Sequence, residues 1–464
     1  MFLLYIIIQL KKIIFFLRAY VSSYIISLEQ RRSFIGWIIR LFDFAFFAFL
    51  FFELFHERKS IMGNYSVDEI LQYVEEEDVK FIRLAFCDIY GKQKNVSIMP
   101  SELTRAFGQG IAIDSSSIYG FSTDIHSDLF LHPDPNTLAI LPWRPEHGRV
   151  VRMICKITYP DGTVFDNDTR SILIKAIKKA DSMGLRFAFG SELEFYLFRI
   201  DEEGNPTKIP YDNAGYMDIS PDDKGENVRR EICLSLEKMG IQPESSHHEE
   251  GPGQNEIDFR YSDALSAADN AITFKNVVKI IASRNGLVAD FSPKPLKDKP
   301  GSGFHINISI KGTEDLPYQD YMIAGIMNRI SEMTLFLNPK HESYERLGSN
   351  KAPKYVSWSK QNRSQLIRIP AATGEYVRAE LRSPDPEANP YLTFALIINA
   401  ALEGIENKME LPEATDVDLF NVPSDNVKGL RRLPSSLEEA KSIARESDFI
   451  GSIIPKSILT DYCK

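Results

Sequence analysis

Several features that define common protein classes are scarce or absent in this sequence. Its 464 residues include four cysteines with no CxxC spacing, which excludes a disulfide framework and a cysteine zinc site. Neither a GxxxxGK[ST] loop nor a GxGxxG motif occurs, so the chain is not a P-loop or dinucleotide-binding protein of the usual kind. With a net charge of −10 and no basic arm, it is not expected to bind nucleic acid. The reduced cysteines favour a cytoplasmic location.

The first 61 residues differ in composition from all that follows. They contain two runs rich in Ile, Leu and Phe, and the second is about as long as a membrane span of roughly 20 residues. That run also carries Arg40, Asp43 and Glu53, each of which costs roughly 2.5–3.5 kcal/mol near a bilayer centre. We expect that the native protein starts at Met62 and that residues 1–61 come from an upstream reading frame. The alternative is a membrane anchor, if they are expressed.

The remainder predicts two domains. Residues 62–160 are expected to form a small, mainly β domain, with a helix capped by Ser66, a hairpin over 80–99 and a strand near 150–165. Residues 161–464 alternate amphipathic helices with strand-like segments, which predicts an α+β domain with helices around an antiparallel sheet. The helices are expected at 169–184, 227–240, 264–286, 321–337 and 389–409.

Two glutamates lie two residues apart in the β-prone run FAFGSELEFYLF. Residues i and i+2 share one face of a strand, so Glu192 and Glu194 would point the same way. Two neighbouring carboxylates repel each other, and burial increases the repulsion. A cation between them would resolve the conflict.

Further candidate ligands follow in short motifs. Glu249 and Glu256 flank a Gly-Pro-Gly turn, His305 follows two glycines, and Glu380 stands between two arginines at i±2. Oxygen ligands with one imidazole suit Mg²⁺ or Mn²⁺ rather than a structural zinc. Taken singly, His305 also fits a hydrogen-bonded core residue and Glu380 an ordinary salt bridge. Five arginines lie close together in the same part of the sequence, and arginines beside metal-binding carboxylates indicate phosphoryl transfer; they are Arg346, Arg363, Arg368, Arg378 and Arg382.

The order and spacing of several motifs resemble those of glutamine synthetase of the bacterial type I group. The motifs are CDIYGKQKNVSI, IDSSSIYGF, GSELEF, HHEEGPGQNEIDF, GSGFHINIS, NRSQLIRIP and RAELRSPDPEANPY, and the resemblance runs from about residue 62 to about 455. It implies an N-terminal β-grasp-like domain and a larger catalytic domain of antiparallel sheet and helices. It also implies an ATP-dependent glutamate–ammonia ligase that proceeds through a γ-glutamyl phosphate.

The resemblance implies a role for each candidate residue. Glu194, Glu249 and Glu256 would hold one metal ion, and Glu192, His305 and Glu380 another, with two or three Mg²⁺ or Mn²⁺ ions per site. The implied substrate contacts are Gly301, Arg346, Arg382 and Glu249, and the implied ATP and phosphate contacts are Arg363, Arg368, Arg378 and Ser309. Tyr216, and Asp88 from a neighbouring subunit, would serve the ammonium, with Arg346 and Arg363 assisting catalysis. The active sites would lie between subunits of a hexamer or dodecamer.

The sequence departs from the family pattern at the amine end of the site. Lys351 stands where a flap glutamate is usual, Pro300 replaces an asparagine, and Asn307 replaces a second histidine. A charged lysine cannot take a proton from an attacking ammonium and would repel it. Glutamate–ammonia ligation therefore has two alternatives: a γ-glutamyl–amine ligase that uses a larger amine, and a non-catalytic regulatory relative.

Overall fold

The computed structural model describes residues 65–121, 127–145, 147–313, 316–372, 377–421, 427 and 429–464. The chain divides into two compact units, 1–64 and 65–464, and every element named below belongs to the second. The expectations for residues 1–61 lie outside the described residues. Among the helices that are described, none has the length and apolar character needed to cross a membrane.

The N-terminal domain is built on a mixed sheet with the strand order β2-β1-β6-β4-β3. The hairpin strands are β1 (Val79–Cys87) and β2 (Gln93–Ile98), and β1 also pairs in parallel with β6 (Arg149–Thr158). The sheet is completed by β3 (Ile111–Asp114), β4 (Asp128–Pro133) and β5 (Ala139–Ile140). Helices α3 (Val67–Glu76) and α4 (Leu103–Gln109) accompany it, with the short turns η1 (Pro100–Glu102) and η2 (Pro135–Thr137). Ser66 and Glu69 form a capping box that fixes the start of α3.

The larger C-terminal domain contains a nine-stranded sheet with the order β13-β14-β15-β12-β7-β10-β9. Its centre is the long strand β7 (Arg186–Ile200), between β12 (Phe304–Lys311) and β10 (Gln254–Asp263), both antiparallel to it. The outer strands are β9 (Pro243–His248), β13 (Trp358–Lys360), β14 (Ile367–Ile369) and β15 (Ala379–Leu381). Two more, β8 (Pro206–Pro210) and β11 (Leu287–Asp290), pair with the far end of β7.

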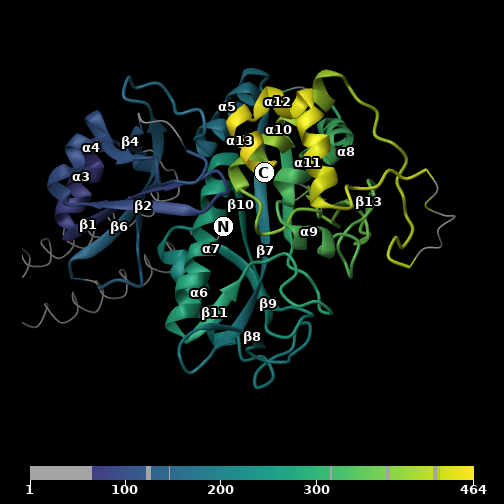
Figure 1. Ribbon diagram of the computed structural model, residues 1–464, viewed down its shortest axis with the longest axis horizontal. Helices are drawn as coiled ribbons and strands as arrows, with labels where there is room; N and C mark the ends of the chain where they lie inside the picture. The colour runs from purple at the N-terminus through teal and green to yellow at the C-terminus, as the bar shows by residue number, and fades with distance from the viewer. Residues whose placement is uncertain are drawn as a thin grey trace, which may run out of the picture. The chain divides into compact units, whose positions relative to one another are not determined.

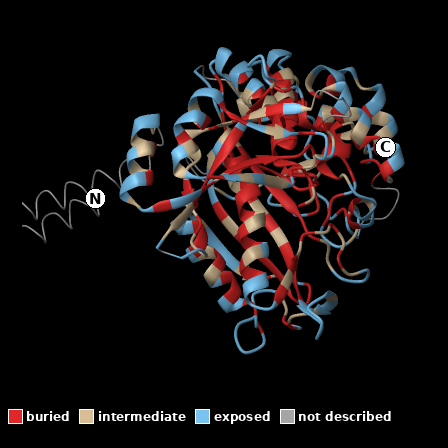
Figure 2. Cartoon of the chain, turned by 60° about the vertical axis from the view of Figure 1, so that its left-hand side comes forward, coloured by how far each residue is buried: buried red, intermediate tan, exposed pale blue. Residues whose placement is uncertain are grey.

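Helices supply the rest of the core of this domain (Figure 1). They are α5 (Thr169–Ser182), α6 (Glu226–Lys238), α7 (Ala264–Arg284), α8 (Tyr318–Leu337), α9 (His341–Arg346), α10 (Pro390–Glu406), α11 (Leu437–Glu446), α12 (Asp448–Ile453) and α13 (Lys456–Tyr462). The central helix α10 is buried along most of its length, and Phe394 stacks on Phe189 of β7 with ring centroids 4.2 Å apart. One face of β7 is thereby closed off from solvent. Figure 2 shows the buried residues, in red, gathered in the interior strands and helices.

A buried polar network joins the two domains. Arg170 of α5 donates to both carboxylate oxygens of Asp269 in α7, at 3.0 and 2.9 Å, and to Asp134 of the N-terminal domain at 2.9 Å. The Tyr391 hydroxyl donates to Asp269 at 2.7 Å. Since all four groups are satisfied by one another, the network positions the small domain against the large one.

The fold class expected from the sequence is confirmed: a β-grasp domain is followed by a larger α+β domain. Each of the expected helices is present within a few residues of its predicted bounds. The three C-terminal helices were not expected.

Candidate active site

The two glutamates of the central strand lie on one face of the sheet. In β7, Leu193 and Phe195 are buried on the opposite face, while Glu192 and Glu194 are partly accessible. The alternation of the strand therefore places both carboxylates toward a cavity of about 460 Å³.

Strand register brings the other polar side chains to the same place. Glu194 lies opposite Glu256 of β10, and Glu256 lies opposite His247 of β9. In the neighbouring row, Asp258 of β10 and His305 of β12 lie on either side of Glu192. Directly opposed residues have side chains about 4.5–5.5 Å apart at Cβ, so two rows of the sheet supply one cluster of ligands.

Glu192, His305 and Glu380 form one group with ligand atoms within 4.8 Å of one another. His305 Nδ1 lies 3.5 Å from Glu192 and 3.9 Å from Glu380, and Asn307 donates to Glu192 at 2.8 Å. Burial alone would raise the pKa of Glu192, but the hydrogen bond with His305 and its charge bring it down to about 2. Glu192 is thus ionised and held in place.

Glu380 lies behind the cavity wall and is only 1% exposed. Arg368 donates to one of its oxygens at 2.6 Å and Arg382 to the other at 2.5 Å. Each carboxylate oxygen has a second lone pair, so the two arginines leave an acceptor position toward His305.

The second group of acids is crowded. Glu194 and Glu256 come within ligand distance of His305, while Glu249 lies 3.6 Å from His247, so the structure does not place Glu194, Glu249 and Glu256 in one such group. Burial and the charge of Glu194 raise the pKa of Glu249 to about 8. Burial, together with the charges of Asp258 and Glu194, raises the pKa of Glu256 well above its ordinary value.

These acids fit a divalent cation. Burial and the charge of Glu192 also raise the pKa of Asp258 to about 7. The carboxylates of Glu194, Glu249, Glu256 and Asp258 therefore repel one another, and a bound cation would relieve that repulsion. The donor set of carboxylate oxygens with imidazole nitrogens suits Mg²⁺ or Mn²⁺.

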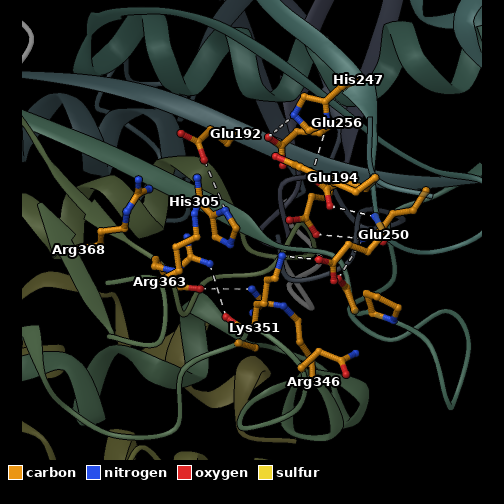
Figure 3. Close-up of a pocket in the computed structure, with 18 of the residues that line it drawn as sticks. Glu192, Glu194, His247, Glu250, Glu256, His305, Arg346, Lys351, Arg363 and Arg368 are labelled. Atoms are coloured by element: carbon orange, nitrogen blue, oxygen red, sulfur yellow. Dashed lines mark hydrogen bonds and ion pairs between the residues drawn. The ribbon is translucent and has the colours of Figure 1, made fainter. Parts of the chain in front are cut away.

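Arginines form the facing wall of the cavity (Figure 3). Arg363, Arg368, Arg378 and Arg382 line it from the segment that holds β14 and β15. Arg378 donates to Asn307 at 2.8 Å, and Asn307 in turn holds Glu192, so the two walls are connected. Acids on one side and guanidinium groups on the other suit a ligand with phosphate groups and metal ions.

Arg346 lies at the base of the cavity beside Gly301. It is buried, and its guanidinium donates to the carbonyl oxygens of Ser383 and Arg382 at 2.8 and 3.2 Å. A Cβ on Gly301 would lie 2.5 Å from the Pro293 carbonyl and 2.9 Å from Arg346 Cγ. Only glycine fits here without displacing Arg346.

The remaining predicted residues are placed differently. Tyr216 lines the cavity next to His247. Ser309 lines a neighbouring cavity of about 270 Å³, which shares Glu192, Asp258 and Arg378 with the first. Asp88 does not line the cavity of its own chain: at the end of β1, it accepts hydrogen bonds from the backbone of Tyr90 and Lys92.

Sequence reasoning missed several residues of the cavity, and four of them lie in or between β9 and β10. Asp258 is two residues from Glu256 on β10, so the spacing that singled out Glu192 and Glu194 could have found it. Gln254 donates to Glu194 at 3.1 Å, and Glu250 adjoins Glu249 in the same motif. His247 belongs to the polar strand β9, for which local sequence gives no signal.

The sheet of the larger domain directs carboxylates and arginines into one cavity, and a β-grasp domain precedes it in the chain. This combination is characteristic of a carboxylate-activating ligase. Family models agree: residues 78–160 match the glutamine synthetase β-grasp domain, and residues 166–464 match the glutamine synthetase catalytic domain. The chain belongs to the glutamine synthetase family.

Individual relatives agree over most of their length. The chain is 45% identical to a glutamine synthetase of Methanosarcina mazei, over 85% of this chain and 92% of that protein. It is 42% identical to one from Clostridium saccharobutylicum, over 86% and 94%. Among solved structures, an ADP complex of GmaS superposes with a TM-score of 0.77 at 26% identity, covering 85% of this chain and 93% of the other.

Proposed function

We propose that this protein catalyses the ATP-dependent ligation of glutamate and ammonia to glutamine, with release of ADP and phosphate. The observation that carries the proposal is the opposition of carboxylates and arginines across one cavity, in a member of the glutamine synthetase family. Such a cavity matches the charges of a nucleotide, its metal ions and an acidic substrate together.

In this proposal, Glu194, Glu249 and Glu256 would hold one divalent ion, and Glu192, His305 and Glu380 another. A bound Mg²⁺ or Mn²⁺ neutralises phosphate charge. Arg363, Arg368 and Arg378, with Ser309 in the adjoining cavity, bind the nucleotide phosphates. Arg346 and Arg382, with the backbone of Gly301, bind the carboxylate groups of glutamate.

Two chemical steps follow from this arrangement. A carboxylate oxygen of glutamate attacks the γ-phosphorus of ATP, and ADP leaves. The amine then attacks the carbonyl carbon of the γ-glutamyl phosphate, and phosphate leaves while the amine loses a proton. Tyr216 lies at the amine end of the cavity, and an acid beside the amine, which we propose to be Asp88 of a neighbouring subunit, is suited to accept that proton.

Asp88 supports an oligomer with shared sites. It lies outside the cavity of its own chain, so a role toward the amine requires it to come from a neighbouring subunit of a hexamer or dodecamer. We propose that such an assembly is the active form and that it works in the cytoplasm.

The test is phosphate release by the purified protein with ATP, Mg²⁺ and glutamate, and either ammonium or a panel of amines. Ammonium-dependent release with glutamine as the product supports the proposal. Release only with a larger amine supports the second candidate, a γ-glutamyl–amine ligase, which Lys351 at the amine end of the cavity favours. Bound nucleotide without release for any acceptor would indicate a regulatory relative.

A further inference from the structure

Lys351 is the only lysine that lines the cavity, within the described parts of the chain. Its ammonium group forms an ion pair with the Glu250 carboxylate (Figure 3). It also lies 5.6 Å from the centre of the Tyr216 ring. A carboxylate and an aromatic face are the two groups by which proteins recognise an ammonium ion. The side chain therefore rests in a position that is built for a small cation.

Hydrogen bonds hold the backbone on both sides of this contact. Lys351 follows α9 in a turn in which the Ser349 amide donates to the Arg346 carbonyl at 2.9 Å and Ala352 donates to Ser349 at 3.1 Å. Glu250 adjoins Glu249, whose carboxylate accepts a hydrogen bond from the Glu250 amide at 3.1 Å. The Lys351 side chain thus spans two anchored segments and can leave without moving either.

The pair is also weak enough to open. The side chains of Lys351 and Glu250 are 53% and 37% exposed, and ion pairs at such exposure contribute little to stability. A competing cation in solution can therefore replace the lysine ammonium at moderate concentration.

We infer that the Lys351 ammonium occupies the acceptor position, so that the acceptor, as an ammonium ion, must displace it in order to bind. This inference rests on the proposed function, because it concerns the acceptor of that reaction. The apparent affinity for the acceptor is then lowered by the fraction of molecules in which Lys351 occupies the position. Lys351 acts as a specificity-determining residue: it raises the acceptor concentration that the enzyme requires.

The chain contains a matched control lysine. Lys208 pairs with Asp290 at 2.6 Å, lies 5.1 Å from the Phe198 ring centre and is 59% exposed, yet it does not line the cavity. Lys351→Met should lower the KM for the acceptor about two- to sixfold and leave the KM for ATP unchanged. Lys208→Met should change neither constant. An unchanged or higher acceptor KM in Lys351→Met would overturn the inference.

A second measurement does not depend on turnover. Brief acetylation followed by peptide mass spectrometry gives the ratio of modification at Lys351 to that at Lys208. This ratio should rise when ammonium chloride replaces sodium chloride at constant ionic strength, and Glu250→Gln should raise it without ammonium. Because both lysines meet the same reagent, its consumption by ammonium cancels in the ratio.

The two measurements separate the inference from the proposed function. Absence of phosphate release with every acceptor would count against the proposed ligase, while the labelling ratio would still report whether ammonium displaces Lys351. A ratio that does not respond to ammonium would overturn the inference even in an active enzyme.

Discussion

Glu194 of β7 and Glu256 of β10 are direct cross-strand partners, on the face of the sheet that lines the cavity. Like charges in this relationship destabilise a sheet. The chain nevertheless adds Asp258 and Glu249 beside them, and burial, together with the repulsion among these charges, raises the pKa values of Glu249, Glu256 and Asp258. This strain in the free protein favours cation binding.

Removal of Glu192 should abolish activity without unfolding the protein. Glu192→Ala takes away the carboxylate that His305 and Asn307 hold, and we expect phosphate release to fall more than about 100-fold. Circular dichroism should be unchanged, and Glu202→Ala, on an exposed turn, is the control. Retained turnover would remove Glu192 from the metal site.

Metal binding should stabilise the protein more at high pH than at low pH. The carboxyl pKa values raised to about 7 and 8 mean that the folded protein binds more protons than the unfolded chain between about pH 4 and 8. The contribution of these groups to the free energy of unfolding therefore falls as the pH rises across that window. Mg²⁺ relieves the repulsion that causes the fall.

The measurement is the melting temperature in EDTA and in Mg²⁺ at pH 5, 6.5 and 8. The increase caused by Mg²⁺ should be largest at pH 8 and should shrink in Glu256→Gln. An equal increase at pH 5 and pH 8 would contradict the role given to these carboxylates.

A methyl group at Gly301 should weaken glutamate binding selectively. Its Cβ would clash with the Pro293 carbonyl and displace Arg346, and such overpacking costs about 1–3 kcal/mol, which corresponds to a KM for glutamate about 5- to 150-fold higher when the whole cost falls on the Arg346 contact. The KM for ATP should stay the same. Gly108→Ala, where a Cβ meets nothing within 4 Å, is the matched control. Equal effects on both substrates would show that Gly301 serves the fold instead.

The network between the domains should matter far more than a surface ion pair. Arg170→Met leaves the buried Asp269 without its cation and also removes the ion pair with the partly exposed Asp134, so we expect a loss of about 3–5 kcal/mol and a lower urea midpoint. Arg105→Met breaks the exposed pair with Glu102 and should cost at most about 1 kcal/mol. Similar midpoints for the two variants would show that the network contributes little.

Local patterns were sufficient for much of the fold. Glu192 and Glu194 were placed on one face because side-chain alternation is a property of any strand. The start of α3 followed from Ser66, and Pro390 in the sequence marks the first turn of α10. Helix α11, which the sequence analysis does not predict, has an equally clear signal, since Ser436 accepts from the Glu439 amide as an N-cap.

Long-range pairing was out of reach of these patterns. That Asp258 and His305 lie on either side of Glu192 depends on the register between β10, β7 and β12, strands separated by dozens of residues. The strand β9 is polar throughout, and it exists because β10 offers it a pairing edge. Such tertiary effects outweigh local strand propensity.

Because of this register, the site is sensitive to the number of residues in each strand as well as to the identity of those residues. A single deletion between Glu192 and Glu194 would turn one of them toward Phe394 and α10, and a deletion earlier in β7 would invert the whole row. Insertions in the loops between strands leave the pairing intact. The one register shift between β10 and β7 lies beyond Phe259, outside the positions that carry Glu256 and Asp258, so a gain or loss of one residue among the site positions themselves would turn those side chains away from the cavity.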